Sequence, residues 1–267
     1  MFGFGYTGII SSMKKVGGAA YGSLTTAWIT ATSETDTTII GALNTLETDL
    51  TTYGLTAKIK ALYPMVGGTA TKHKFNFMDA RDLDAAYRLT FFGGGTHSST
   101  GYLPNGTNAY ANTFLNNNTV LSLNSTHISA YSRSNIGTNS ALIGCFGASE
   151  TAVFPKYAGS SFLYAVNGGE YSVANSDSRG LFSSNRIISS SVTAWKNGTK
   201  VATTAGASTS KPNENITLSA LNSTGARYYF GAHELAFASI GDGLTDGEQA
   251  NLYTAVQAFQ TTLSRQI

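Results

Sequence analysis

The sequence predicts an all-β sandwich of two antiparallel sheets, with one helix before it and another after it. Short alternating or apolar segments recur, separated by turn residues, at the spacing of about 8–12 residues that is typical of sandwiches. The dipeptide Asn197-Gly198 lies between two alternating runs and predicts a type I′ hairpin, whose central residues both need a positive φ. Thr245, followed three residues later by Glu248, predicts a capping box at the start of the last helix.

Composition narrows the classes of function. The chain has 267 residues, of which only 12% are charged, and its formal net charge is +2. A nucleic-acid-binding protein would show a basic stripe, so we expect no nucleic-acid partner. No apolar run approaches the roughly 18 residues that a membrane-spanning helix needs. The surface must be built from Ser, Thr, Asn and Gly, which suits a particle exterior or a secreted module. The single cysteine, Cys145, lies in an apolar run and is expected in the core.

The N-terminal part differs from the rest. In residues 1–32, glycines alternate with Phe2, Phe4 and Tyr6, and a segment of small residues follows. No helical or strand period is visible there. Such a segment cannot order itself, so we interpret residues 1–32 as an attachment segment that docks on another protein.

Residues 33–56 are predicted to form a helix. Ser33 to Asp36 read as a cap, and Gly54 is a suitable stop. Apolar residues recur between them at helical spacing, namely Ile39, Ile40, Leu43, Leu46 and Leu50. This apolar side either packs on the sheet of its own domain or associates with copies of itself.

The third segment, residues 57–267, is predicted to be the sandwich with its C-terminal helix. Leu252, Val256, Phe259 and Leu263 form one stripe of that helix, expected to cover a sheet. Strands are predicted over residues 59–63, 75–77, 87–92, 108–115, 127–133, 141–146, 161–166, 171–174, 192–196, 200–203, 216–218, 228–231 and 235–240.

Catalytic and metal chemistry have little support in the sequence. Glycosidases on a sandwich of this kind need paired carboxylates, whereas Glu150, Glu170 and Glu234 are each isolated along the chain, so no enzyme is expected. Asp79, Asp82 and Asp84 are the candidates for a calcium site; the alternative is a solvated turn with a local salt bridge. No other cofactor is indicated.

Four residues are candidates for ligand binding. His97, Tyr102 and Tyr110 belong to a glycine-rich polar loop, which either holds a sugar or is an ordinary connection between strands. Trp195 precedes the Asn197-Gly198 turn. If its ring faces outward it is a sugar-stacking or interface candidate, and if it faces inward it is a core residue.

Three stretches carry a family resemblance. They are residues 58–91, residues 96–113 and residues 237–263, and the last of them contains the ending GLTDGEQ. Together they resemble a laminin-G-like module of virion proteins from tailed bacteriophages, especially those of Bacteroidetes hosts. The resemblance spans about three quarters of the chain, begins near Lys58 and implies a concanavalin-A-like (laminin-G-like) jelly-roll sandwich.

The resemblance also implies a function. It points to a structural virion protein, such as a head fibre, a decoration protein or a tail-associated component. The protein would be made in the host cytoplasm, displayed on the virion surface and bound to other virion proteins. We expect it to be a homo-oligomer, a trimer or another ring. The alternative is a glycan-binding adhesin that engages the host surface. The resemblance carries over no catalytic or binding residue.

Overall fold

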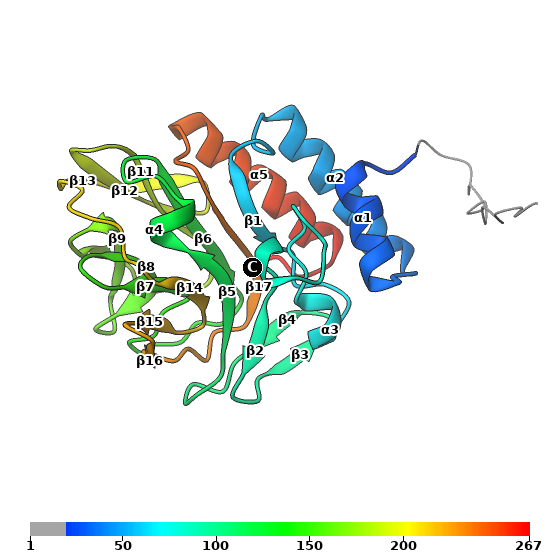
Figure 1. The fold of residues 1–267 in the computed structure, drawn as a ribbon, viewed down its shortest axis with the longest axis horizontal. Coiled ribbons are helices and arrows are strands. Elements are labelled where there is room, and N and C mark those ends of the chain that lie inside the picture. Colours follow the sequence, from blue (N-terminus) through cyan, green and yellow to red (C-terminus); the bar gives the residue numbers. More distant parts are fainter. Residues whose placement is uncertain (1–19) are drawn as a thin grey trace, which may run out of the picture.

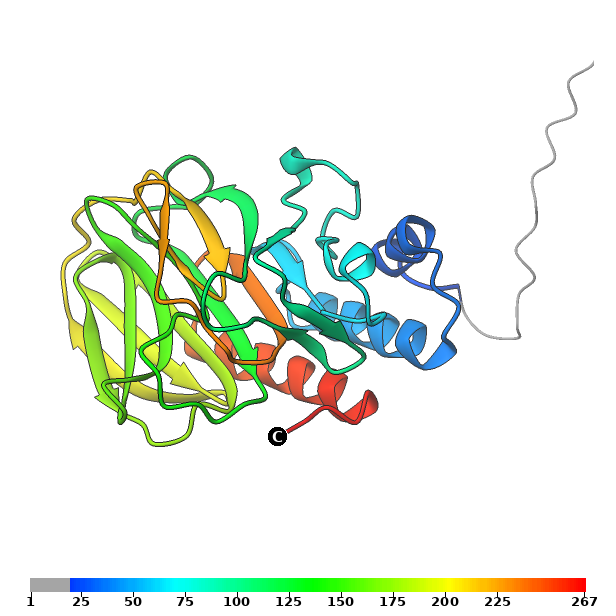
Figure 2. The same cartoon turned by 90° about the horizontal axis from the view of Figure 1, so that it is seen from below.

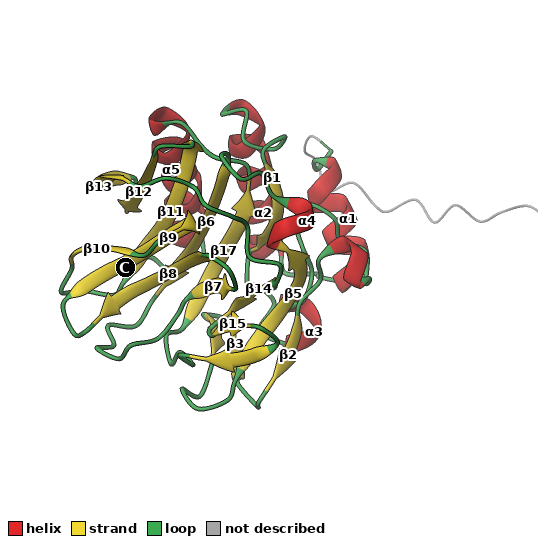
Figure 3. Cartoon of the chain, turned by 60° about the vertical axis from the view of Figure 1, so that its left-hand side comes forward, coloured by secondary structure: helices red, strands yellow, loops and turns green. Residues whose placement is uncertain are grey.

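The protein is a jelly-roll β-sandwich covered on one side by helices. We describe it from a computed structural model, in which the described residues are 20–267 (Figure 1). The predicted attachment residues Phe2, Phe4 and Tyr6 lie outside this range. Two antiparallel sheets face each other, with helices at the start and the end of the described chain (Figure 3). The predicted fold class is thus confirmed.

The first sheet, called here the helix-side sheet, has eight strands. Its central strands β6 and β17 pair along most of their length and are buried on both faces. Its order is β13 (Thr199–Ala205), β12 (Ser191–Lys196), β11 (Gly180–Ile188), β6 (Thr126–Ser132), β17 (Leu235–Gly241), β4 (Gly101–Leu103) and β3 (Thr96–Ser98), with β1 (Ile59–Tyr63) also paired to β17.

The second sheet, called here the outer sheet, has nine strands. Its main order is β10 (Tyr171–Ala174), β9 (Ser161–Gly168), β8 (Glu150–Tyr157), β7 (Ile143–Phe146), β14 (Asn215–Leu218), β5 (Tyr110–Asn116) and β2 (Thr90–Phe92). A short hairpin of β15 (Leu221–Ser223) and β16 (Ala226–Tyr228) joins it through a parallel pairing of β15 with β7.

Alternation along the strands divides the apolar residues between two cores. On β6, Ile128 and Ala130 point into the core between the sheets, whereas Tyr131 points to the other face. The core between the sheets also takes Cys145 from the outer sheet, as predicted. The central strands of the helix-side sheet carry almost no exposed residue, because the outer sheet covers one face of it and the helices cover the other.

The second core lies between the helix-side sheet and the helices. The helices α2 (Thr37–Thr52) and α5 (Asp246–Thr262) run side by side below that sheet (Figure 2). The predicted stripe of α5 is buried there at Leu252, Val256 and Phe259, and Leu263 is partly buried. The short elements α3 (Ala70–His73), η1 (Asp84–Ala86) and α4 (Asn117–Val120) lie in connections between strands.

Helix α2 packs on its own domain. Leu43, Leu46 and Leu50 are fully or almost fully buried in the core shared with α5. Of the two interpretations of this apolar side, packing within the chain is therefore correct, and self-association through it is not. A trimer stays a prediction, and it needs another contact surface.

The predicted helix and turn signals are found in the structure. The Thr245–Glu248 capping box is present, and Asn197 and Gly198 both have positive φ. Helix α2 begins later than predicted, because Asp36 is its N-cap. It ends in a Schellman motif, in which Gly54 N–H donates to the Thr51 carbonyl and Leu55 N–H donates to the Leu50 carbonyl.

Other local predictions were wrong. Residues 75–77 form no strand and instead follow α3, and strand β16 ends at Tyr228 instead of continuing to residue 231. Helix α1 (Ser23–Thr32) was missed, and its Trp28 is fully buried against α2. The start of α1 is capped from a distance, since the Glu47 carboxylate of α2 accepts from the backbone N–H groups of Leu24 and Thr25.

Candidate functional site: an aromatic cleft on the outer sheet

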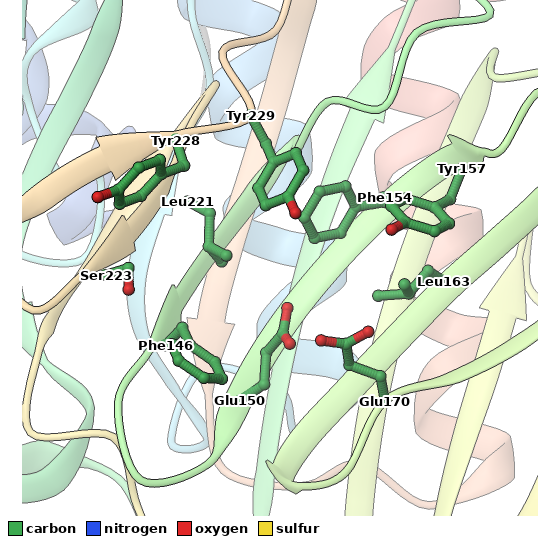
Figure 4. A pocket seen from close by; sticks show the side chains of 10 residues that line it. All are labelled: Phe146, Glu150, Phe154, Tyr157, Leu163, Glu170, Leu221, Ser223, Tyr228 and Tyr229. Carbon is green, nitrogen blue, oxygen red and sulfur yellow. The ribbon is translucent and has the colours of Figure 1, made fainter.

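A cleft opens on the outer sheet, on the face turned away from the helices. Its volume is about 520 Å³, within the range usual for small-molecule sites. Strands β7, β8 and β9, the β9–β10 turn and the β15–β16 hairpin supply its walls (Figure 4). The lining side chains are Phe146, Glu150, Phe154, Tyr157, Leu163, Glu170, Leu221, Ser223, Tyr228 and Tyr229.

Strand pairing builds the floor of the cleft. Phe154 of β8 lies directly opposite Leu163 of β9, and both side chains are buried together with Leu221 in a small cluster on the outer face. Tyr157 packs on the edge of this cluster, with its ring centroid 5.7 Å from that of Phe154. The floor is therefore apolar and firmly packed.

The β15–β16 hairpin forms one wall. Its tip turns at Thr224 and Gly225, both at positive φ, as a two-residue type I′ hairpin requires. The pairing of β15 with β7 places Ser223 beside Phe146. Phe146 is 38% exposed and Tyr228 is 53% exposed, so two aromatic rings remain open to solvent at this wall. Large apolar groups left exposed on one concave surface are typical of binding sites.

Tyr229 is held in a strained conformation at the rim. Its φ is +52°, a value that bulky residues rarely adopt. Its carbonyl accepts a hydrogen bond from the Ala141 N–H at 3.0 Å, and its ring meets Phe154 edge to face at 5.3 Å. This backbone conformation fixes the Tyr229 ring against Phe154 at the rim of the cleft.

Two glutamates face each other across the other end of the cleft (Figure 4). Glu150 begins β8, where it pairs with both Phe146 and Gly168, and Glu170 follows two residues after Gly168. The premise that these glutamates are isolated was therefore wrong, since the β8–β9 hairpin brings them together. Glu150 is only 3% exposed, whereas Glu170 is exposed.

The environment of Glu150 favours its protonated form. Burial, and then the neighbouring Glu170 carboxyl, raise the pKa of Glu150 to about 9. Glu150 Oε2 is buried and has no hydrogen-bond partner among residues 20–267. Lysine, arginine and histidine are absent from the described residues that line the cleft. The cleft thus offers aromatic faces and carboxyl oxygens, and it offers no cation to a ligand.

The ligand candidates from the sequence lie elsewhere. Tyr102 is fully buried, so its ring has no face free for a sugar. His97 is half-buried, and its Nδ1 lies 3.0 Å from the Nδ1 of His73. Phe91 packs edge-on against the His97 ring at 4.4 Å. This part of the loop is therefore a packed aromatic and histidine cluster.

The other two ligand candidates, Trp195 and Tyr110, differ in how deeply they are buried. Trp195 is only 4% exposed and donates from Nε1 to Thr193 Oγ1, so of its two interpretations the core one fits the structure. Tyr110 is half-buried and stacks on Phe92, with ring centroids 4.9 Å apart. Tyr110 also contacts Phe230, which follows the cleft residue Tyr229. Of the four ligand candidates from the sequence, only Tyr110 thus lies near the cleft.

The aspartate cluster is a set of ion pairs. Asp79 pairs with Arg81, Asp82 with Lys74, and both Asp82 and Asp84 with Arg88. The Arg81 guanidinium lowers the pKa of Asp79, as a salt bridge should. Within residues 20–267, no group of three or more His, Cys, Asp or Glu side chains could hold a metal. The turn with local salt bridges is thus the interpretation that matches these contacts.

Comparisons with known proteins give likenesses in structure. No family model matches the chain, and the search of curated proteins gave no match. The chain is similar in structure to a mutant of the Trypanosoma rangeli sialidase that displays trans-sialidase activity. The match covers 82% of this chain and 39% of the sialidase chain, at 6% identity and a TM-score of 0.50.

Two further likenesses are weaker. Domain 4 of AbnA, an extracellular GH43 arabinanase from Geobacillus stearothermophilus solved with arabinotriose, is 11% identical over 73% of this chain and 98% of its own, with a TM-score of 0.46. The CBM40 of the Ruminococcus gnavus IT-sialidase, bound to α2,3 sialyllactose, is 15% identical over 47% of this chain and 80% of its own, with a TM-score of 0.36. These two likenesses carry no argument, and the likeness to the sialidase mutant concerns the fold alone, which the two sheets described above already establish.

Proposed function

We propose that this protein is a glycan-binding module whose binding site is the cleft on the outer sheet. The observation that carries the proposal is the combination of exposed aromatic rings with a buried carboxyl whose oxygen has no partner among residues 20–267. A sugar ring has an apolar face of C–H groups and a rim of hydroxyls. Phe146 and Tyr228 can cover the apolar face, and Glu150 and Glu170 can accept from the hydroxyls. The cleft volume suits one or two sugar units.

A glycan array followed by titration calorimetry tests this proposal. We expect saturable binding to at least one glycan, weakened about tenfold or more by Tyr228→Ala, because stacking on that ring is lost. Tyr21→Ala is the matched control, since Tyr21 is 49% exposed and lies outside the cleft. No saturable binding to any glycan, or an equal loss in both variants, would contradict the proposal.

We also propose that the module binds without hydrolysing its ligand. Glu150 and Glu170 are close enough to share a hydrogen bond when one of them is protonated. Glycosidase carboxyls instead stand roughly 5–9.5 Å apart, so that the sugar or a water fits between them. Chromatography of the bound oligosaccharide after long incubation checks this. Shortened products that Glu150→Gln no longer yields would refute it.

A second role, compatible with the first, is that of an exterior component of a tailed-phage particle. It is supported by the sequence resemblance of residues 58–91, 96–113 and 237–263. A variant that lacks residues 1–19 tests attachment through the N-terminus. The deletion stops at residue 19 because Trp28 belongs to the helix core. The shortened protein should fold but no longer join particles, as shown by immunolabelling in electron micrographs. Incorporation at the normal copy number would place attachment elsewhere.

A further inference from the structure

The carboxyl pair in the cleft has no positively charged partner among the described residues that line the cleft. Glu150 is nine-tenths buried or more, and its Oε2 has no hydrogen-bond partner among residues 20–267. Figure 4 shows its carboxyl and that of Glu170 turned toward each other within the cleft. Two carboxylates at one site repel each other, so one of them keeps a proton unless another cation neutralises the pair. A positive charge from a ligand would therefore be favourable at the position that the Glu150 proton occupies.

We propose that the cleft recognises a sugar with a primary ammonium group, an unacetylated amino sugar, and that the ammonium lies between Glu150 and Glu170. This inference rests on the proposed glycan-binding function and names the class of its ligand. An ammonium carries three donors and no acceptor, which matches two carboxyls that together offer only acceptors once both are ionised. The charge makes these hydrogen bonds stronger than those from a neutral hydroxyl.

The surroundings of the pair favour an ammonium over a metal ion and over an acidic sugar. Calcium needs six to eight oxygen ligands, whereas the cleft walls near the pair are mostly aromatic and aliphatic. Aromatic faces attract an ammonium through their quadrupole. An acidic sugar would meet two carboxyls, and none of the described lining residues is a lysine, arginine or histidine.

Binding should release a proton. The titratable side chains around Glu150 are Glu170, the cleft tyrosines Tyr157, Tyr228 and Tyr229, and the Cys145 thiol of β7. Burial, and then the charges of Glu150 and Glu214, raise the pKa of that thiol, which stays neutral. Glu150 is therefore the group that gives up a proton to the buffer when the ammonium arrives.

Calorimetry with three β-1,4-linked tetramers tests the inference at a pH of about 6, where an ordinary amine is protonated. The probes are tetramers of glucosamine, of N-acetylglucosamine and of glucose. We expect the glucosamine tetramer to bind about tenfold tighter than the other two, because the charge-assisted hydrogen bonds outweigh the cost of removing the proton from Glu150. We also expect the heat of binding to depend on the ionisation enthalpy of the buffer, because a proton is released.

Variants separate this inference from the proposed function. Glu150→Gln and the exposed Glu170→Gln should both abolish the advantage of the glucosamine tetramer. Asp49→Asn, which removes one carboxylate from α2 on the helix side, should keep it. Equal binding of all three tetramers, lost in Tyr228→Ala, would overturn the ammonium inference and leave glycan binding standing. Spermidine binding as tightly as the glucosamine tetramer, or no binding by any of the three tetramers, would also overturn the ammonium inference, and the glycan array then decides the proposed function separately.

Discussion

Replacing Glu150 by glutamine should change how the stability of the protein depends on pH. The pKa of Glu150 is about 9 in the folded protein against an ordinary value of 4.5, and burial is the main cause. A group whose pKa is raised by folding contributes its full stability below the unfolded value and loses it as the pH rises through the folded value. The stability contribution of Glu150 should therefore be lost between about pH 5 and pH 9.

The magnitude follows from the linkage relation. Within that window, each pH unit costs at most about 1.4 kcal/mol for one titrating group. Between pH 6 and pH 8 the wild type should lose up to about 3 kcal/mol relative to Glu150→Gln, since glutamine has nearly the same shape and does not titrate. Water that reaches Glu150 from the open cleft lowers the loss below this limit.

Urea unfolding at a series of pH values measures this difference. The comparison uses the wild type, Glu150→Gln and the control Asp49→Asn, and the difference between curves isolates the contribution of the substituted group. Asp49→Asn should follow the wild type. Parallel curves for the wild type and Glu150→Gln would refute the assignment of a protonated, buried carboxyl in the cleft.

Three further predictions concern the fold. Trp195→Ala should lower the free energy of unfolding by about 3–5 kcal/mol, because the ring is buried; an unchanged denaturation midpoint would restore its interpretation as an exposed ligand-binding residue. Gly198→Val should lower the melting temperature, since Gly198 has a φ of +71° and its added Cβ would lie 2.8 Å from Tyr253 Cδ1; an unchanged melting temperature would contradict the turn. Burial lowers the pKa of His127 to about 4, so the stability contribution of His127 is present above about pH 6.5 and lost as the pH falls toward 4. In the urea series, the plot of unfolding free energy against pH therefore has an acid limb, in which stability falls with falling pH. His127→Gln should flatten this acid limb. An unaltered acid limb would show that His127 is not neutral in the fold.

Local signals in the sequence predicted local structure well. The Asn197-Gly198 turn, the Thr245–Glu248 capping box and the Gly54 stop each depend on residues within a few positions of one another, and all three are present. Helix α1 was missed because its capping carboxylate, Glu47, lies on another helix. Strand β11 was missed because its buried polar residues find distant partners. Arg186, for example, donates to the Val166 and Gly206 carbonyls.

The candidate site could not be read from the sequence for a similar reason. Glu150 and Glu170 are twenty positions apart, and only the register of the β8–β9 hairpin, in which Glu150 pairs with Gly168, brings them together. Because strand β8 was not predicted, the pairing register that brings the two glutamates together could not be predicted either. Tyr228 was assigned to a strand, but nothing local indicates that the β15–β16 hairpin holds its ring over the outer sheet.

A crystal structure of the protein with a bound glucosamine tetramer tests the central claim most directly. The account predicts a sugar ring between Phe146 and Tyr228 on the outer sheet. It also predicts an ammonium nitrogen within about 2.7–2.9 Å of carboxyl oxygens from both Glu150 and Glu170. A sugar bound at another surface, such as the loop of His97 and Tyr110, with the cleft empty, would contradict it.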